Sequence, residues 1–168
     1  MRVREDAVER ADGAPGLYGV VEKPTAALVI AAERGGFWLV EQYRYPLGRR
    51  SWEFVQGTWP AGGGGTAEEL ARAELAEETG LRAGELRHLG RLDIAPGLTT
   101  QQTDVWLAGD LTPGPTAREA TEADMRCEFV PEAELRAMVA DGRFTDAPSL
   151  AALALLLVHR DGRSASEE

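Results

Sequence analysis

The stretch "TAEELARAELAEETGL", residues 66–81, decides how the rest of this sequence is interpreted. It predicts a helix from 67 to 79. Thr66 and Glu69 have the spacing of a capping box, in which each side chain accepts a hydrogen bond from the other residue's backbone amide. Gly80 is suited to the left-handed conformation that ends many helices.

Three glutamates share one face of this predicted helix. Glu74, Glu77 and Glu78 are at positions i, i+3 and i+4, so their carboxylates point the same way. Such a set is either a solvated acidic face or a site for a hard cation such as Mg²⁺ or Mn²⁺, which prefers carboxylate oxygen. The glycine-rich loop "GTWPAGGGG" at 57–65 leads into the helix and favours the cation site.

Outward from this helix, strand and helix patterns follow one another without strict alternation. The apolar run at 25–33 is typical of a central strand, and 37–45 follows as its hairpin partner. Further strands are expected at 86–94, 102–108 and 125–130, and further helices at 131–142 and 147–160. This order predicts an α/β fold of the α+β type, with a mixed β-sheet between helices rather than a doubly wound parallel sheet.

The composition is that of a globular protein with an acidic balance. The chain has 168 residues, a size typical of one domain, and a formal net charge of −10. That charge argues against binding to nucleic acid or to an anionic membrane surface, and the longest apolar run, at 150–158, is too short to span a bilayer. Cys127 is the only cysteine, so no intrachain disulfide is possible and a cytoplasmic protein is expected.

The motif "ELAEETGL" at 74–81 makes the sequence resemble the Nudix hydrolases, whose signature is G-x5-E-x7-R-E-U-x-E-E-x-G-U, with U a bulky aliphatic residue. The second half of the signature matches in full. In the first half, Ala73 stands where the family has arginine, and Gly57 fits the opening glycine only with a longer loop. The resemblance extends over residues 25 to 160 and implies a Nudix α/β/α sandwich.

The resemblance implies hydrolysis of the pyrophosphate bond in a nucleoside diphosphate linked to another group. Glu74 and Glu78 are then the main ligands of Mg²⁺, or of Mn²⁺, and Glu77 is a second ligand or bridging group that takes part in catalysis. The backbone carbonyl of Gln56 is expected to supply a further oxygen. A small-molecule nucleotide is the expected partner, since bound cations let an acidic site take an anionic ligand.

The general base is expected from the segment "REATEADM", residues 118–125. In the ADP-ribose-type members that the chain resembles, the base comes from a loop between later strands. Glu119 and Glu122 are the candidates here, with Glu122 slightly favoured. The alternative for each of them is an ordinary loop charge.

Three side chains before the motif are candidates for direct contact with the substrate. Arg44 offers a guanidinium for phosphate or ribose oxygens, with a surface arginine as the alternative. Glu53 offers a carboxylate for a hydroxyl or amine, unless it forms an ion pair with Arg49 or Arg50. Trp52 offers a ring for base stacking, unless it belongs to the core.

The segment "APGLTTQQ", residues 95–102, bears on the substrate class. Pro96 follows Gly80 at a spacing typical of ADP-ribose-type members. Gln101 lies where these members often have an acidic residue, and it is expected to contact the substrate. ADP-ribose or a nucleotide sugar is therefore the expected substrate, with GDP-mannose, NADH or another dinucleotide as variants.

Two other functions are compatible with the pattern. A ligand sensor or degenerate binding protein of the same fold is favoured by Ala73 and the altered loop, and opposed by the three intact glutamates. An enzyme that removes oxidised nucleoside triphosphates is disfavoured by Pro96 and by the long N-terminal segment.

We expect a single domain over residues 1–168, with one or two strands in 1–22 and a disordered tail at 161–168. ADP-ribose-type members are commonly dimers in which the N-terminal strands reach across to the partner. Residues 1–22 are suited to this contact, so a homodimer is expected.

Overall fold

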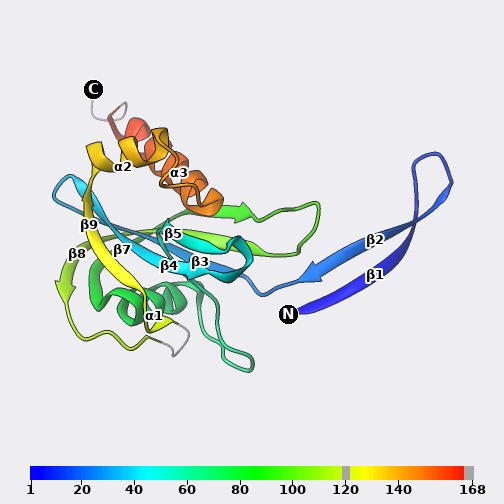
Figure 1. Ribbon diagram of the computed structural model, residues 1–168, viewed down its shortest axis with the longest axis horizontal. Helices are drawn as coiled ribbons and strands as arrows, with labels where there is room; N and C mark the ends of the chain where they lie inside the picture. Colours follow the sequence, from blue (N-terminus) through cyan, green and yellow to red (C-terminus); the bar gives the residue numbers. More distant parts are fainter. Residues whose placement is uncertain (119–121, 165–168) are drawn as a thin grey trace.

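The computed structural model describes residues 1–118 and 122–164, and Figure 1 shows its elements. The strands are β1 (Arg2–Glu9), β2 (Pro15–Glu22), β3 (Ala26–Glu33), β4 (Gly36–Arg44), β5 (Arg49–Glu53), β6 (Val55–Gly57), β7 (Leu81–Asp93), β8 (Gln102–Pro113) and β9 (Arg126–Pro131). The helices are α1 (Ala67–Thr79), α2 (Glu132–Ala140) and α3 (Ala147–Ser164), with a 3-10 turn at Tyr45–Leu47.

A mixed seven-stranded sheet forms the centre of the described fold. Five strands follow the order β5-β4-β3-β8-β7, while β6 pairs with β3 and β9 pairs with β4. The pair of β3 and β8 is parallel, and the other pairs of this sheet are antiparallel. The predicted mixed sheet is confirmed, with the run at 25–33 as its central strand.

Strand β3 explains why helices cover both faces of the sheet. Leu28 and Ile30 belong to a core cluster that includes Leu135 of α2 and Leu156 of α3. Val29, which alternates with them, belongs to a second cluster that includes residues of α1. Figure 1 accordingly shows α1 on one side of the sheet and α2 and α3 on the other. The α/β/α sandwich is confirmed.

Helix α1 begins and ends where the sequence predicts. Thr66 Oγ1 accepts a hydrogen bond from Glu69 N at 3.1 Å, and Glu69 Oε2 accepts one from Thr66 N at 2.7 Å, which completes the capping box. Gly80 follows the helix with a φ of 73°, in the left-handed region. A Cβ atom at Gly80 would also collide with the carbonyl oxygen of Gly114, so two separate constraints require glycine here.

Two strands and one helix are longer than the sequence predicts. Strand β7 begins at Leu81 rather than 86 and β8 continues to Pro113 rather than 108, because the two strands pair along their whole length. Helix α3 continues to Ser164, so residues 161–164 are helical rather than the start of a disordered tail, and 165–168 lie outside the described residues. Among the described helices, none is long and apolar enough to cross a membrane.

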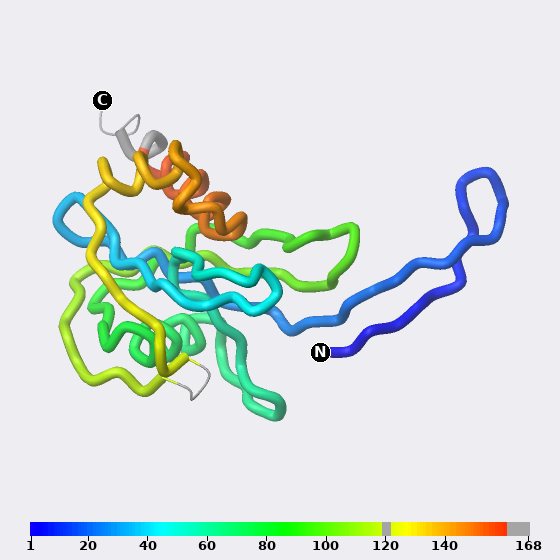
Figure 2. The backbone as a smooth tube through the Cα atoms, in the orientation of Figure 1, coloured from blue at the N-terminus to red at the C-terminus, as the bar shows by residue number. Residues whose placement is uncertain are grey.

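Strands β1 and β2 form a separate hairpin that projects from the body of the molecule, as the tube in Figure 2 shows most clearly. At the base of this N-terminal hairpin, Val21 N donates to Leu98 O at 2.9 Å and Thr100 N donates to Val21 O at 3.1 Å. These bonds tie the hairpin to the turn between β7 and β8. The predicted strands in residues 1–22 are confirmed.

Candidate active site

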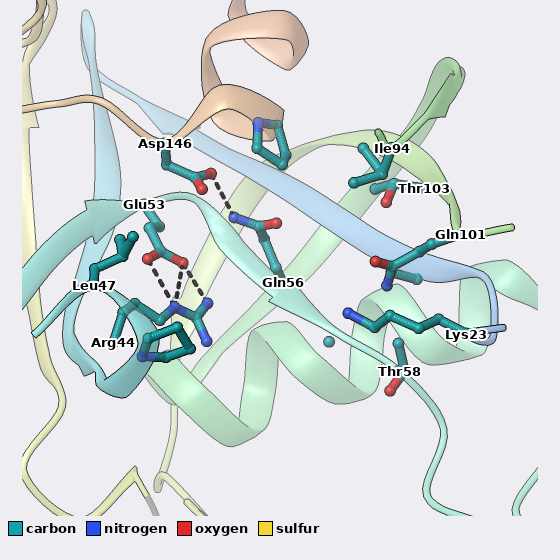
Figure 3. A pocket seen from close by; sticks show the side chains of 14 residues that line it. Lys23, Arg44, Leu47, Glu53, Gln56, Thr58, Ile94, Gln101, Thr103 and Asp146 are labelled. Atoms are coloured by element: carbon teal, nitrogen blue, oxygen red, sulfur yellow. Dashed lines mark hydrogen bonds and ion pairs between the residues drawn. The ribbon is translucent and has the colours of Figure 1, made fainter. Parts of the chain in front are cut away.

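Two pockets adjoin at the end of β6, because Gln56, Gly57 and Thr58 line both of them. The glutamate pocket is the one that is further lined by Trp59, Pro60, Leu70, Ala73, Glu74, Glu77 and Glu122. The arginine pocket is the one whose further lining includes Lys23, Arg44, Glu53, Gln101, Thr103 and Asp146. Figure 3 shows the arginine pocket from close by.

The glutamate pocket brings the helix motif and the segment predicted to carry the base into one site. Glu74 and Glu77 of α1 and Glu122, which precedes β9, line the same cavity. The sequence alone does not show that these two segments are close in space, because strands β7 and β8 lie between them in the chain. The other predicted base, Glu119, lies outside the described residues.

Glu78 is the buried member of the motif. Its side chain is 1% exposed, and its Oε2 atom has no hydrogen-bond partner among the described residues. Burial raises the pKa of this carboxyl to about 9, and the nearby charges of Glu122 and Glu74 add to the rise, while Arg44 opposes it. A buried carboxylate oxygen that lacks a donor is a group that a cation would satisfy.

Gly57 is required by the close approach of β6 to α1. A Cβ atom at this position would collide with the carboxylate of Glu74. Glycine therefore lets the backbone that follows Gln56 lie directly against the motif. This proximity is compatible with a backbone carbonyl of β6 acting beside the carboxylates.

The donor set in and beside the glutamate pocket fits a hard divalent cation. Carboxylate and carbonyl oxygens are the ligands that Mg²⁺ and Mn²⁺ prefer. Within residues 1–118 and 122–164, no group of three or more His, Cys, Asp or Glu side chains is already arranged as a metal-binding cluster.

In the arginine pocket, Arg44 and Glu53 are bound to each other (Figure 3). Arg44 Nε donates to Glu53 Oε1 at 2.9 Å, and Arg44 Nη2 donates to Glu53 Oε2. Glu53 is 2% exposed, whereas the Arg44 side chain is 38% exposed. The hydrogen bond to Glu53 raises the pKa of Arg44. Glu53 thus orients a permanent positive charge whose exposed edge faces the pocket.

A second network joins the pocket to the start of α3. Asp146 Oδ2 accepts hydrogen bonds from Gln56 Nε2 at 2.8 Å, from Ser149 N at 3.0 Å and from Ser149 Oγ at 2.7 Å. Ser149 Oγ in turn accepts from Phe54 N at 3.0 Å. Asp146, which precedes α3 and accepts a hydrogen bond from a backbone amide of its first turn, therefore also fixes the side chain of Gln56.

The structure places three of the four residues predicted to contact the substrate in the arginine pocket. Arg44, Glu53 and Gln101 line it, but Trp52 lines neither pocket and packs, partly buried, against the core cluster on the α2 and α3 side. The prediction missed Lys23, which also lines the pocket. Its signal was available, because Lys23 is the single lysine of the sequence.

Comparison with known proteins identifies the family. The NUDIX domain family matches residues 21–153. The chain is 35% identical over 159 residues to the ADP-ribose pyrophosphatase of Mycobacterium tuberculosis (strain ATCC 25618 / H37Rv), a match that covers 94% of this chain and 75% of that protein. It is 32% identical over 116 residues to the ADP-ribose pyrophosphatase of Bacillus subtilis (strain 168), covering 68% of this chain and 62% of that protein.

A solved structure, described as an ADP compounds hydrolase, has a TM-score of 0.84 to this chain at 22% sequence identity. The match covers 96% of this chain and 86% of that one, and it confirms the fold. From the match over residues 21–153 and the identity to the two relatives, the chain belongs to the Nudix family. The predicted resemblance to Nudix hydrolases of the ADP-ribose pyrophosphatase type is confirmed.

Proposed function

We propose that this chain hydrolyses the pyrophosphate bond of ADP-ribose or a related nucleotide sugar, with Mg²⁺ or Mn²⁺ as its metal. The observation that carries the proposal is the glutamate pocket, where Glu74 and Glu77 lie with Glu122 near the buried carboxyl of Glu78. The two relatives named as ADP-ribose pyrophosphatases support the substrate class.

The motif would hold the metal through Glu74, Glu77, Glu78 and the backbone carbonyl of Gln56. When bound, such a metal neutralises the charge of the anhydride and lowers the pKa of water. Glu122 accepts the proton of the water that attacks phosphorus. The P–O–P bond then breaks and releases two phosphomonoesters.

The arginine pocket would hold the rest of the substrate. Arg44, fixed by Glu53, offers paired N–H donors to phosphate or ribose oxygens. Lys23 adds a second positive charge and Gln101 an uncharged amide to the same pocket. These cations complement the anionic ligand in a chain whose net charge is −10.

The test measures release of the nucleoside monophosphate from ADP-ribose, GDP-mannose, NADH, diadenosine polyphosphates and oxidised nucleoside triphosphates, with Mg²⁺, with Mn²⁺ and with EDTA. We expect metal-dependent cleavage of ADP-ribose or a nucleotide sugar that Glu78→Gln abolishes. The matched control is Glu68→Gln, on the first turn of the same helix, where Glu68 pairs with Arg72. This control retains wild-type turnover.

Other outcomes separate the alternatives. Binding of a nucleotide without any turnover would identify a ligand-binding protein, the function that Ala73 favoured at the sequence level. Preferential hydrolysis of oxidised nucleoside triphosphates would overturn the substrate class. Full activity of Glu78→Gln would remove the motif from the mechanism.

We further propose that the protein is a homodimer built through its N-terminal hairpin. Val3 and Leu17 of this hairpin are each 69% exposed. A two-stranded hairpin is marginally stable by itself in water, so contact with a second copy would stabilise it. The lone Cys127 is consistent with a reducing cytoplasm.

A further inference from the structure

Glu122 lies in a short segment that is not part of the sheet. The residues from Glu122 to Asp124 form a turn, closed by a hydrogen bond from Met125 N to Glu122 O at 2.9 Å, and β9 begins only at Arg126. A single turn is not stable in isolation, because fixing its dihedral angles costs more than one hydrogen bond returns. Something else must hold Glu122 in the glutamate pocket.

Arg118 provides one such support. Its Nε donates to the carbonyl oxygen of Glu78 at 2.8 Å, and its Nη1 donates to the carbonyl oxygen of Met125. One guanidinium therefore joins the last turn of α1 to the residue that closes the turn of Glu122. The neighbouring amide of Ala117 donates to Glu77 O at 3.0 Å. The bonds to Glu77 O and Glu78 O therefore also satisfy two carbonyls that a helix leaves unpaired at its end.

Arg50 of β5 provides a second support from the sheet. Its Nη1 donates to Asp124 Oδ2 at 2.6 Å and its Nη2 donates to Asp124 O at 2.9 Å. The same guanidinium is fixed on strand β4, where Nε donates to Glu41 Oε2 at 2.8 Å and Nη2 donates to Glu41 O at 3.0 Å. The turn of Glu122 is thus attached at two adjacent residues. Arg50 connects Asp124 to the sheet, and Arg118 connects Met125 to helix α1.

Both supports use the feature that separates arginine from lysine. The guanidinium presents several N–H donors in one rigid plane, so it can bind two acceptors on different elements at fixed angles. Neither arginine lines the glutamate pocket or the arginine pocket, so neither is placed to contact substrate. Their effect on a reaction must therefore pass through the residues they hold.

We propose that Arg118 and Arg50 are positioning residues that fix Glu122 against the end of α1. The inference rests on the proposed function, in which Glu122 accepts the proton of the attacking water. The two arginines set the distance between this carboxylate and the motif carboxylates. Displacement of the turn would leave substrate binding in the arginine pocket intact and slow the chemical step.

The test compares Arg118→Gln and Arg118→Lys with the wild-type protein in the ADP-ribose assay. Because small misplacement of a catalytic group has large effects, we expect Arg118→Gln to lower kcat by roughly 10- to 100-fold with KM unchanged. Arg118→Lys keeps the charge but donates from a single nitrogen, so it recovers part of kcat. The matched control is Arg136→Gln on α2, where Arg136 is 65% exposed and pairs with Glu132. This control keeps the wild-type kcat.

A double-mutant cycle separates positioning from a general loss of structure. If Arg118 acts through Glu122, then Arg118→Gln causes no further loss of kcat once Glu122→Gln is present. A loss by the same factor in both backgrounds would overturn the proposal, and so would an unchanged kcat in Arg118→Gln. If Arg118→Gln does not fold, Arg50→Gln and Arg50→Lys carry the same cycle.

The outcomes also distinguish this inference from the proposed function. Full activity of Glu122→Gln, or no metal-dependent turnover by the wild-type protein, would overturn the proposed role of Glu122 and this inference with it. A Glu122→Gln variant that loses turnover beside an Arg118→Gln variant that retains it would overturn the inference alone.

Discussion

At the scale of single residues, Glu78 combines deep burial with an unsatisfied carboxyl oxygen beside the glutamate pocket. A carboxyl group that is 1% exposed, with one oxygen lacking a hydrogen bond, is costly to ionise in the metal-free fold. A protein selected for stability alone would place an apolar or amide side chain there. Its presence in the motif is consistent with a cation that offsets the burial when it binds.

Glu78→Gln should therefore change how stability depends on pH in the metal-free protein. The folded-state pKa of Glu78 is raised to about 9 from its ordinary value of 4.5. Between these values the unfolded chain has released the proton and the folded chain retains it. Stability then falls as pH rises, by up to about 1.4 kcal/mol per pH unit from this group.

We expect urea unfolding in EDTA to show a wild-type free energy that falls from about pH 6 to about pH 8 more steeply than that of Glu78→Gln. Glu68→Gln is the control, since Glu68 is exposed and paired with Arg72. It should follow the wild-type profile. Parallel profiles for the wild type and Glu78→Gln would show that this carboxyl does not titrate as its burial requires.

The ion-pair partner of Glu53 was only partly predictable from the sequence. Arg49 and Arg50 are nearer in sequence, but Arg44 is the partner. Alternation along β5 places Arg50 on the opposite face from Glu53, so the alternative of an ion pair with Arg50 was wrong. Arg49 shares the face of Glu53 and instead donates to Thr145 Oγ1, a contact that depends on where the chain returns after α2.

At the scale of elements, α1 was predictable because its signals are local. The capping box and Gly80 act within a few residues of the helix ends, so no knowledge of tertiary contacts was needed. Strands β7 and β8 were predicted too short, since the charged residues at their ends interrupt the apolar pattern. Those ends are strands because each pairs with the other, and pairing is a non-local property.

Removing the N-cap of α1 should destabilise the helix that carries the motif. Thr66→Ala deletes the acceptor for Glu69 N, which costs about 1 kcal/mol of unfolding free energy. Thr116→Ala, in the exposed loop after β8, is the control and should leave that free energy unchanged. Urea denaturation followed by circular dichroism measures both, and equal stability of the two variants would contradict a contribution from the cap.

The pairing of β7 with β8 contains an ion pair with a defined dependence on pH. Asp104 of β8 is 3% exposed and accepts hydrogen bonds from Arg91 Nε at 2.9 Å and Arg91 Nη2 at 2.7 Å. The bond from Arg91, and to a smaller extent that of His88, lowers the pKa of Asp104 below its ordinary value of 3.8. Its stabilising contribution is therefore present above that value and is lost as pH falls below it.

Asp104→Asn should lower the unfolding free energy near neutral pH by about 1–3 kcal/mol, because a charged acceptor is replaced by a weaker one. The difference from wild type should shrink as pH falls through the range below 3.8. Asp93→Asn, an exposed residue of the same strand pair that binds Gln102, is the matched control. A difference that stays constant down to low pH would show that Asp104 acts through shape rather than charge.

At the scale of the whole molecule, both faces of β3 are buried, one against α1 and the other against α2 and α3. This burial defines the sandwich and thereby positions the site. The sequence predicted this architecture because one strand is apolar on both faces and the motif helix has clear ends. It did not predict that Arg118 and Arg50 meet the turn of Glu122, since those contacts join segments far apart in the chain. For the N-terminal hairpin, the sequence predicted one or two strands in residues 1–22. It did not predict the length of these strands or the register in which they pair.

The N-terminal hairpin should be the determinant of the proposed homodimer. Leu17→Arg places a charge on an apolar side chain that is 69% exposed in one chain and would be buried against a partner. Light scattering should then report a dimer for the wild type and a monomer for this variant. Val158→Arg is the matched control, because Val158 is also 69% exposed but lies on α3. A monomeric wild type, or dissociation by Val158→Arg with Leu17→Arg still dimeric, would move the interface away from the hairpin.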